Sequence, residues 1–170
     1  RPLPLENDER TVIRRTNSMI ESFTGRSPRG WMGPGLAETY DTPDILMEEG
    51  IEYVCDWVND DQPYVMNTKY GRLVSLPYTV EMNDIPMYMV QHHRSPEIYE
   101  RGRDQFDTLY REAETSARVM CIAVHPYISG APHRIKYLDM LLEYIASHEG
   151  VLMWTGGQIL DWFNTASASA

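Results

Sequence analysis

The side chain best placed for chemistry in this sequence is His125. It directly follows an apolar, partly β-branched run at residues 119–124, and turn-forming residues come after it. Such a run is typical of a buried strand of an α/β sheet. Ligands of parallel α/β folds bind at the carboxyl ends of strands, and imidazole transfers protons near neutral pH. His125 is therefore either a proton-transferring residue or a histidine that caps the sheet by hydrogen bonding to a carbonyl.

Asp56 lies at the end of a second apolar run, residues 51–57, in the same way. The other histidines form no ready metal site, because the adjacent pair His92 and His93 points to different faces of any regular element. Cys55 and Cys121 fall inside predicted buried strands without CxxC spacing. We interpret them as core residues of a reducing compartment, and we expect no metal site within this chain.

Composition restricts the class of protein. The chain has 170 residues, 42% of them hydrophobic, with 11 Tyr and 4 Trp, which favours one folded domain over disorder. We place this domain at residues 1–165 and expect a disordered tail at residues 166–170. The net charge of −10 disfavours nucleic acid and anionic membranes as partners. The sequence shows no apolar run long enough to cross a bilayer and begins without a signal peptide, so we expect a cytoplasmic protein.

Helices that alternate with short apolar runs predict an α/β fold of parallel βα units. The expected helices are residues 7–23, 42–50, 95–113, 132–147 and 157–163. The expected strands are residues 27–32, 51–57, 119–124 and 151–154, together with a hairpin at 64–78 and a polar loop at 81–86. These units are too few to close a barrel, which points to sequence missing from this chain.

Four segments in chain order resemble the polysaccharide deacetylase (NodB-homology, carbohydrate esterase 4-like) superfamily. They are RGWMGP at residues 29–34, YVCDWVNDDQP at 53–63, LPYTVEMNDIP at 76–86 and VHPY at 124–127. The resemblance covers about residues 6–163 and is strongest to the metal-independent allantoinase branch. It implies the C-terminal portion of a distorted (β/α) barrel. The superfamily's first two motifs, which carry the catalytic base and the metal-binding histidines, would then precede Arg1.

The resemblance also implies catalytic roles. Arg29 would pair with and orient the upstream catalytic aspartate, as a guanidinium fork can. Asp56 would steady neighbouring catalytic groups. His125 would act as general acid on the leaving nitrogen, and a nearby Asp56 carboxylate would favour the protonated form that this role needs.

Four further residues are expected to bind substrate. Trp31 and Trp57 would form walls of the pocket. Glu81 and Asn83, in the branch-specific loop that also holds Asp84, would lie over the substrate, or else belong to a solvated turn.

The resemblance predicts a hydrolase of non-peptide C–N bonds that opens the ring of allantoin or a related ureide. The alternatives are an N-deacetylase of acetylated amino sugars and a fragment without activity until a partner completes it. We expect no cofactor in this chain, although a divalent metal could bind through upstream residues. The expected partners are a small ureide or acetylated amino sugar and further copies of the chain, in a homo-oligomer.

Overall fold

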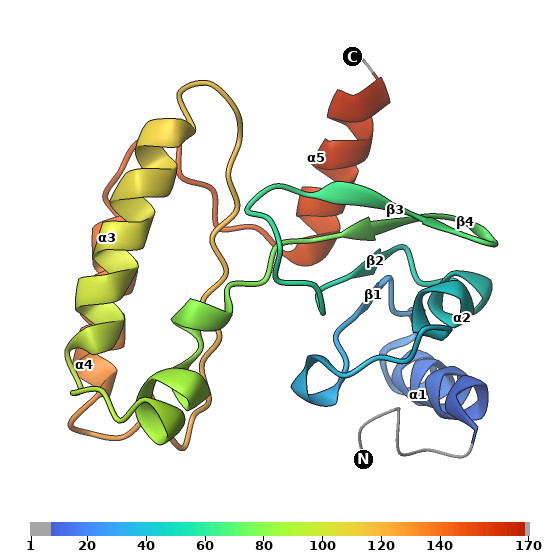
Figure 1. Cartoon of the computed structure of the whole chain (residues 1–170), viewed down its shortest axis with the longest axis horizontal. Helices are drawn as coiled ribbons and strands as arrows, with labels where there is room; N and C mark the ends of the chain where they lie inside the picture. Colours follow the sequence, from blue (N-terminus) through green and yellow to red (C-terminus); the bar gives the residue numbers. More distant parts are fainter. Residues whose placement is uncertain (1–7, 169–170) are drawn as a thin grey trace. The chain divides into compact units, whose positions relative to one another are not determined.

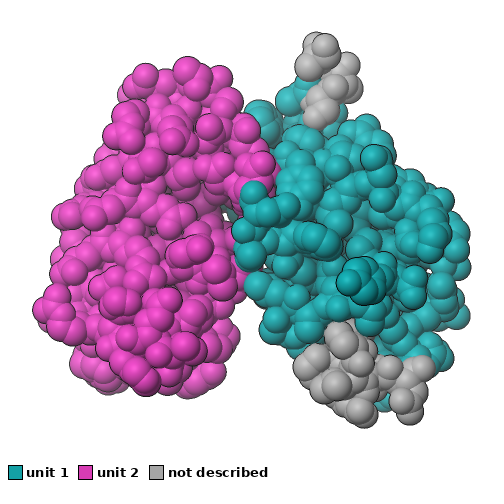
Figure 2. Space-filling model, viewed as in Figure 1, with its two compact units in different colours: residues 1–59, 63–76, 154–170 teal, residues 60–62, 77–153 magenta. Residues whose placement is uncertain are grey.

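The computed structural model describes residues 8–168 (Figure 1). The chain folds as two compact units, shown in different colours in Figure 2. Unit 1 comprises residues 1–59, 63–76 and 154–170, and unit 2 comprises residues 60–62 and 77–153. The prediction that residues 1–165 form a partial NodB-homology domain stays a prediction. The second unit has its own hydrophobic core, which lies around helices that the first does not contain.

Unit 1 contains a four-stranded sheet in the order β1 (Gly30–Trp31), β2 (Tyr53–Val54), β4 (Gly71–Ser75), β3 (Tyr64–Thr68). β1 with β2 and β2 with β4 run parallel, while β3 and β4 form an antiparallel hairpin. The parallel pairing and the hairpin confirm the predictions. β1 and β2 are shorter than predicted, because each pairs over only two residues.

Three α-helices and the short 3₁₀ helix η2 (Pro34–Leu36) complete the described part of unit 1. α1 (Glu9–Thr24) begins after Asp8, whose side chain accepts a hydrogen bond from the Thr11 backbone N–H, and ends at Gly25 in the left-handed conformation. α2 (Thr42–Glu48) carries a proline in its first turn. α5 (Gly156–Ala168) continues past residue 165, where the disordered tail was predicted to begin, and residues 169–170 lie outside the described part. The largest core cluster consists of Ile13, Ile45, Leu46, Ile51, Val54 and Leu73.

Unit 2 is built on α3 (Glu97–Glu112) and α4 (Ile135–Ala146), which pack side by side (Figure 1). Gly102 permits their close approach, since a Cβ there would lie 2.5 Å from Leu141 Cδ2. The fully or nearly fully buried core includes Met82, Ile98, Phe106, Leu141 and Ile145. The predicted polar loop at residues 81–86 instead contributes to two short helices, η3 (Val80–Met82) and the π-helix η4 (Ile85–Val90).

Two predicted strands are wrong. Residues 119–124 form no regular strand and make only an isolated parallel bridge between Asn83 and Ala123. The chain turns into η4 directly after this bridge, so the pairing cannot extend. Residues 151–154 also lack strand structure. Within residues 8–168, no helix combines the length and the apolar character needed to cross a membrane.

Candidate functional site

The bridge between Asn83 and Ala123 brings Asp84 next to His125 in unit 2. The Asp84 backbone N–H donates to the Ala123 carbonyl over 3.1 Å. His125 Nδ1 then lies 2.6 Å from Asp84 Oδ1. The Asp84 side chain is fully buried, whereas 35% of the His125 side chain is exposed. The pair thus joins a desolvated carboxylate to an imidazole that solvent or a ligand can reach.

The second oxygen of Asp84 holds the turn that follows His125. Asp84 Oδ2 accepts hydrogen bonds from the His125 backbone N–H and from Ser129 Oγ, each over 2.7 Å. Ile128 and Ser129 also donate their backbone N–H groups to the His125 carbonyl. Across the part of the chain that the structure describes, His125 Nε2 makes no hydrogen bond. That nitrogen is the part of the ring left for a reacting group.

Asn83 and Glu81, predicted to bind substrate, have local contacts in unit 2. Asn83 Nδ2 donates to the Tyr78 hydroxyl over 2.6 Å, and its Oδ1 accepts from the Ile85 backbone N–H at the start of η4. The Glu81 side chain is exposed, and its carbonyl accepts a hydrogen bond from Arg101. These contacts explain the local fold, and substrate binding by either residue stays a prediction.

Unit 1 holds the Asp56 site. The Gly33 backbone N–H donates to both carboxylate oxygens of Asp56, over 2.7 and 3.0 Å. A Cβ at residue 33 would lie 3.0 Å from Asp56 Oδ2 and 2.9 Å from the Ala37 carbonyl, so glycine permits this approach. Burial raises the pKa of Asp56. The carboxylate lines an open pocket of about 270 Å³ together with Leu36, Glu38 and Trp57.

Glu38 is a member of this pocket that sequence reasoning missed. Its Oε2 accepts a hydrogen bond from Trp57 Nε1 over 3.1 Å. Burial and the neighbouring Asp56 carboxyl raise the pKa of Glu38 to about 7. Residue 38 lies between the predicted elements, where no periodicity or motif marks it. Only the fold reveals that it contacts two residues with predicted roles.

Arg29 and Trp31 lie on or next to β1. The Arg29 guanidinium forms paired hydrogen bonds with Glu52, and with Asp161 of α5. Trp31 is half-buried against the core of unit 1. Orientation of an upstream aspartate by Arg29 stays a prediction, as does a substrate wall at Trp31.

The sequence predicted an Asp56 carboxylate near His125, and that proximity stays a prediction. Asp56 belongs to unit 1, and the carboxylate that contacts the imidazole is Asp84 of unit 2. Asp84 belongs to the LPYTVEMNDIP segment, and the resemblance implies that it lies in the loop over the substrate. The bridge at Asn83, which the helical and strand patterns do not predict, is what places it.

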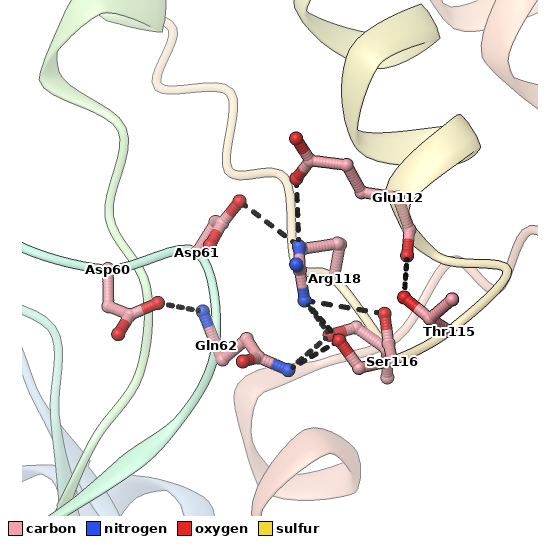
Figure 3. A network of polar contacts seen from close by, with 8 residues as sticks. Asp60, Asp61, Gln62, Glu112, Thr115, Ser116 and Arg118 are labelled. Atoms are coloured by element: carbon pink, nitrogen blue, oxygen red, sulfur yellow. Dashed lines mark hydrogen bonds and ion pairs between the residues drawn. The ribbon is translucent and has the colours of Figure 1, made fainter.

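The loop after Asp56 is anchored in unit 2 by Arg118 (Figure 3). Arg118 Nε lies 3.4 Å from Asp61 Oδ2 and 3.2 Å from Glu112 Oε2. The Val119 backbone N–H donates to the Asp61 carbonyl over 2.8 Å. Asp60 Oδ1 accepts a hydrogen bond from the Gln62 backbone N–H over 3.0 Å. Arg118 thus fixes the start of the segment that ends at His125.

Residues 8–168 contain no group of three or more His, Cys, Asp or Glu side chains placed to hold a metal ion. The metal that the resemblance implies for true deacetylases therefore has no ligand set among the described residues.

Comparison with known proteins gives the family. The model described as "Glycosyl hydrolase family 57" matches residues 2–120. A Schizosaccharomyces pombe protein named "Putative polysaccharide deacetylase" is 36% identical over 115 residues, 61% of this chain and 36% of its own length. The "Peptidoglycan deacetylase" of Helicobacter pylori is 26% identical over 188 aligned positions, 91% of this chain and 63% of its own.

The solved structure of "Puue Allantoinase" matches with a TM-score of 0.85 and 30% identity. The match covers 92% of this chain and 53% of the allantoinase chain. The chain therefore spans about a third to two thirds of the length of these relatives. The α/β fold is that of a portion of a NodB-homology barrel, as predicted. The chain belongs to glycosyl hydrolase family 57 by its matching family model, and by its relatives to the NodB-homology superfamily of deacetylase- and allantoinase-like hydrolases.

Proposed function

We propose that this protein hydrolyses a non-peptide C–N bond, with a cyclic ureide such as allantoin as substrate and His125 as general acid. The observation that carries the proposal is the His125 ring: Nδ1 is held by a buried carboxylate while the side chain is partly exposed. A proton donor needs both features, a fixed orientation and access to the reacting atom. The structural likeness to an allantoinase supports the choice of substrate.

The reaction is the addition of water to an amide carbonyl followed by cleavage of the C–N bond. The oxygen of water bonds to the carbonyl carbon, and its proton passes to a base that the resemblance places outside these 170 residues. The C–N bond then breaks, and its electron pair takes a proton from Nε2 of protonated His125. Protonation matters because an unprotonated amide nitrogen is a poor leaving group.

The test is turnover of allantoin by the full-length protein carrying His125→Ala. General acid catalysis contributes about 10²- to 10⁴-fold, so we expect kcat to fall by at least about 100-fold. His133→Ala is the matched control, since His133 is an exposed histidine of the same unit. Equal turnover by wild type and His125→Ala would contradict the proposal.

The second candidate function is N-deacetylation of an acetylated amino sugar, which the names of the two deacetylase relatives support equally. It uses the same departing nitrogen and the same acid. Assays of allantoin and of N-acetylated amino sugars, each with and without chelator, separate the two, because metal-dependent deacetylation would stop when the ion is removed.

Assembly is a separate part of the proposal. We propose that the protein acts as a homo-oligomer and that the 170-residue chain requires a second segment or chain for the base. Light scattering combined with activity assays tests this. A monomeric 170-residue chain that turns over substrate would contradict it.

A further inference from the structure

We propose that Glu38 is the residue that selects the substrate, by binding the N–H groups of a ureide in the pocket that Asp56 and Trp57 also line. This inference rests on the proposed function and deepens it, because it names the part of the substrate that the pocket recognises. It is carried by contacts within unit 1, to which all residues of the pocket belong.

The Glu38 carboxyl is held in place but keeps one oxygen unused. Its Oε2 accepts the indole N–H of Trp57 over 3.1 Å, which restrains the orientation of the carboxyl. Its Oε1 is buried, and among residues 8–168 it receives no hydrogen bond from an N–H or a hydroxyl. A carboxylate has about four acceptor positions, and a buried oxygen without a donor is costly. An N–H donor of a bound molecule would satisfy this oxygen.

A second buried polar atom close to the same acids has the opposite character. Trp31 Nε1 is a donor, and it forms no hydrogen bond within the part of the chain that the structure describes. It lies 3.5 Å from the position that a Cβ at residue 33 would occupy, and Asp56 Oδ2 lies 3.0 Å from that same position. An unused acceptor and an unused donor are therefore both found near the Asp56 carboxyl. Amide-type groups complement both, since they combine N–H donors with a carbonyl acceptor.

The pocket has acceptors in excess and no cation to match them. Asp56 is only 8% exposed, and the Gly33 backbone N–H donates to both of its oxygens. Across residues 8–168, no ion pair involves Glu38 or Asp56. Burial and the neighbouring Asp56 hold the pKa of Glu38 at about 7, so its ionised form is populated near neutral pH and can accept N–H bonds.

These features distinguish the two candidate substrates. A carboxylate can accept two parallel N–H bonds from one planar group. A ureido group, –NH–CO–NH₂, offers two such N–H groups side by side, whereas the acetamido group of an N-acetylated sugar offers one. The Trp57 ring, which is 42% exposed, provides an apolar face beside the carboxyl for a planar group. Glu38 therefore favours a ureide over an acetylated amino sugar.

The first experiment is ¹H–¹⁵N NMR of the indole N–H groups in the wild-type 170-residue chain, titrated with allantoin and separately with N-acetylglucosamine. Each indole signal is assigned from the corresponding Trp→Phe variant. Trp154 and Trp162 do not line the pocket, so their signals are an internal control. We expect allantoin to shift the signals of Trp31 and Trp57, and N-acetylglucosamine to shift them less at equal concentration. No shift with allantoin, or equal shifts with both compounds, would overturn the proposal.

Two variants assign the selection to Glu38. Glu38→Gln keeps an acceptor for Trp57, but its amide N–H₂ replaces the free oxygen, so we expect the affinity for allantoin to fall by about 10- to 100-fold. Glu21→Gln, at an exposed glutamate of α1, is the matched control and should bind allantoin like the wild type. Unchanged affinity in a folded Glu38→Gln would overturn the assignment.

Binding and turnover separate this inference from the proposed function. The titrations need no catalysis, so unchanged turnover by full-length His125→Ala would overturn the general acid and leave the Glu38 result standing. In the full-length protein, Glu38→Gln is expected to raise KM for allantoin by at least about 10-fold, with a smaller change in kcat. An equal loss of kcat/KM for allantoin and for N-acetylglucosamine would indicate a general structural role for Glu38 and overturn the selection.

Discussion

Trp57 Nε1 donates a hydrogen bond to Glu38 Oε2 over 3.1 Å, in the pocket that Asp56 also lines. Two acidic side chains in one partly buried pocket cannot both ionise freely, and Glu38 is the one whose pKa rises to about 7. A residue without any sequence signal therefore links the predicted wall at Trp57 to the predicted acid at Asp56.

The raised pKa of Glu38 beside Asp56 predicts that the stability of the fold depends on pH. The pKa of Glu38 is raised from 4.5 to about 7 in the folded chain, so the folded state binds the proton more tightly than the unfolded state. The resulting stabilisation is complete below about pH 4.5 and is lost as the pH rises through about 7. We expect the free energy of unfolding to fall by about 1 kcal/mol over this pH range, after discounting for the partial exposure of the Glu38 side chain.

Urea unfolding of wild type and Glu38→Gln at pH 5 and pH 8 measures this effect. The glutamine keeps an acceptor for Trp57 but does not titrate, so its free energy of unfolding should fall less between the two pH values. Burial also raises the pKa of Asp56, and that contribution is common to both proteins. Identical pH dependence in the two proteins would show that Glu38 does not titrate in this range.

Gly33→Ala should disrupt the Asp56 site. The new Cβ would lie about 3 Å from both Asp56 Oδ2 and the Ala37 carbonyl, and overpacking of this kind costs about 1–3 kcal/mol. Gly35→Ala is the matched control, because its φ of 66° is strained for alanine but no atom lies within 4 Å of the new Cβ. We expect both to lower the free energy of unfolding, and only Gly33→Ala to change the pH dependence that involves Asp56. The same pH dependence in both variants would contradict this account.

The Arg29 contact with Asp161 should be a measurable coupling. Arg29 Nη2 lies 2.7 Å from Asp161 Oδ1 and the pair is exposed, so a double-mutant cycle of Arg29→Ala and Asp161→Ala should give a small but non-zero coupling free energy. The coupling should weaken at high salt. Additive effects of the two substitutions would mean that the contact contributes nothing to stability.

Arg118→Ala should loosen the start of the segment that leads to His125. The variant loses contacts with Asp61, Glu112 and Ser116, so the hydrogen bond from the Val119 N–H to the Asp61 carbonyl should open more often. We expect the exchange of the Val119 amide hydrogen to accelerate by about 10-fold, which corresponds to about 1.4 kcal/mol. Arg103→Ala, which removes an exposed arginine of α3, should leave this exchange rate unchanged. Equal protection of the Val119 amide hydrogen in wild type and Arg118→Ala would show that Arg118 does not hold this segment in place.

The sequence by itself determined the features that depend on residues close to one another in the chain. Asp8 and Gly25 mark the two ends of α1, and the turn between β3 and β4 defines their hairpin, because capping and turn formation are decided within a few residues. The sequence also predicted the parallel pairing of β1 with β2, since apolar runs separated by helices leave few other arrangements. The resemblance to the NodB-homology superfamily came from motif order in the sequence as well.

Only the tertiary structure decided which carboxylate meets which partner. Residues 119–124 have the composition of a strand, yet a strand needs a neighbour to pair with, and the neighbouring segment turns into η4 after one bridge. That same bridge places Asp84 against His125 across 41 residues of sequence. Glu38 reaches Trp57 in a comparable way. Contacts between segments distant in sequence depend on how the chain packs as a whole, and no local pattern records them.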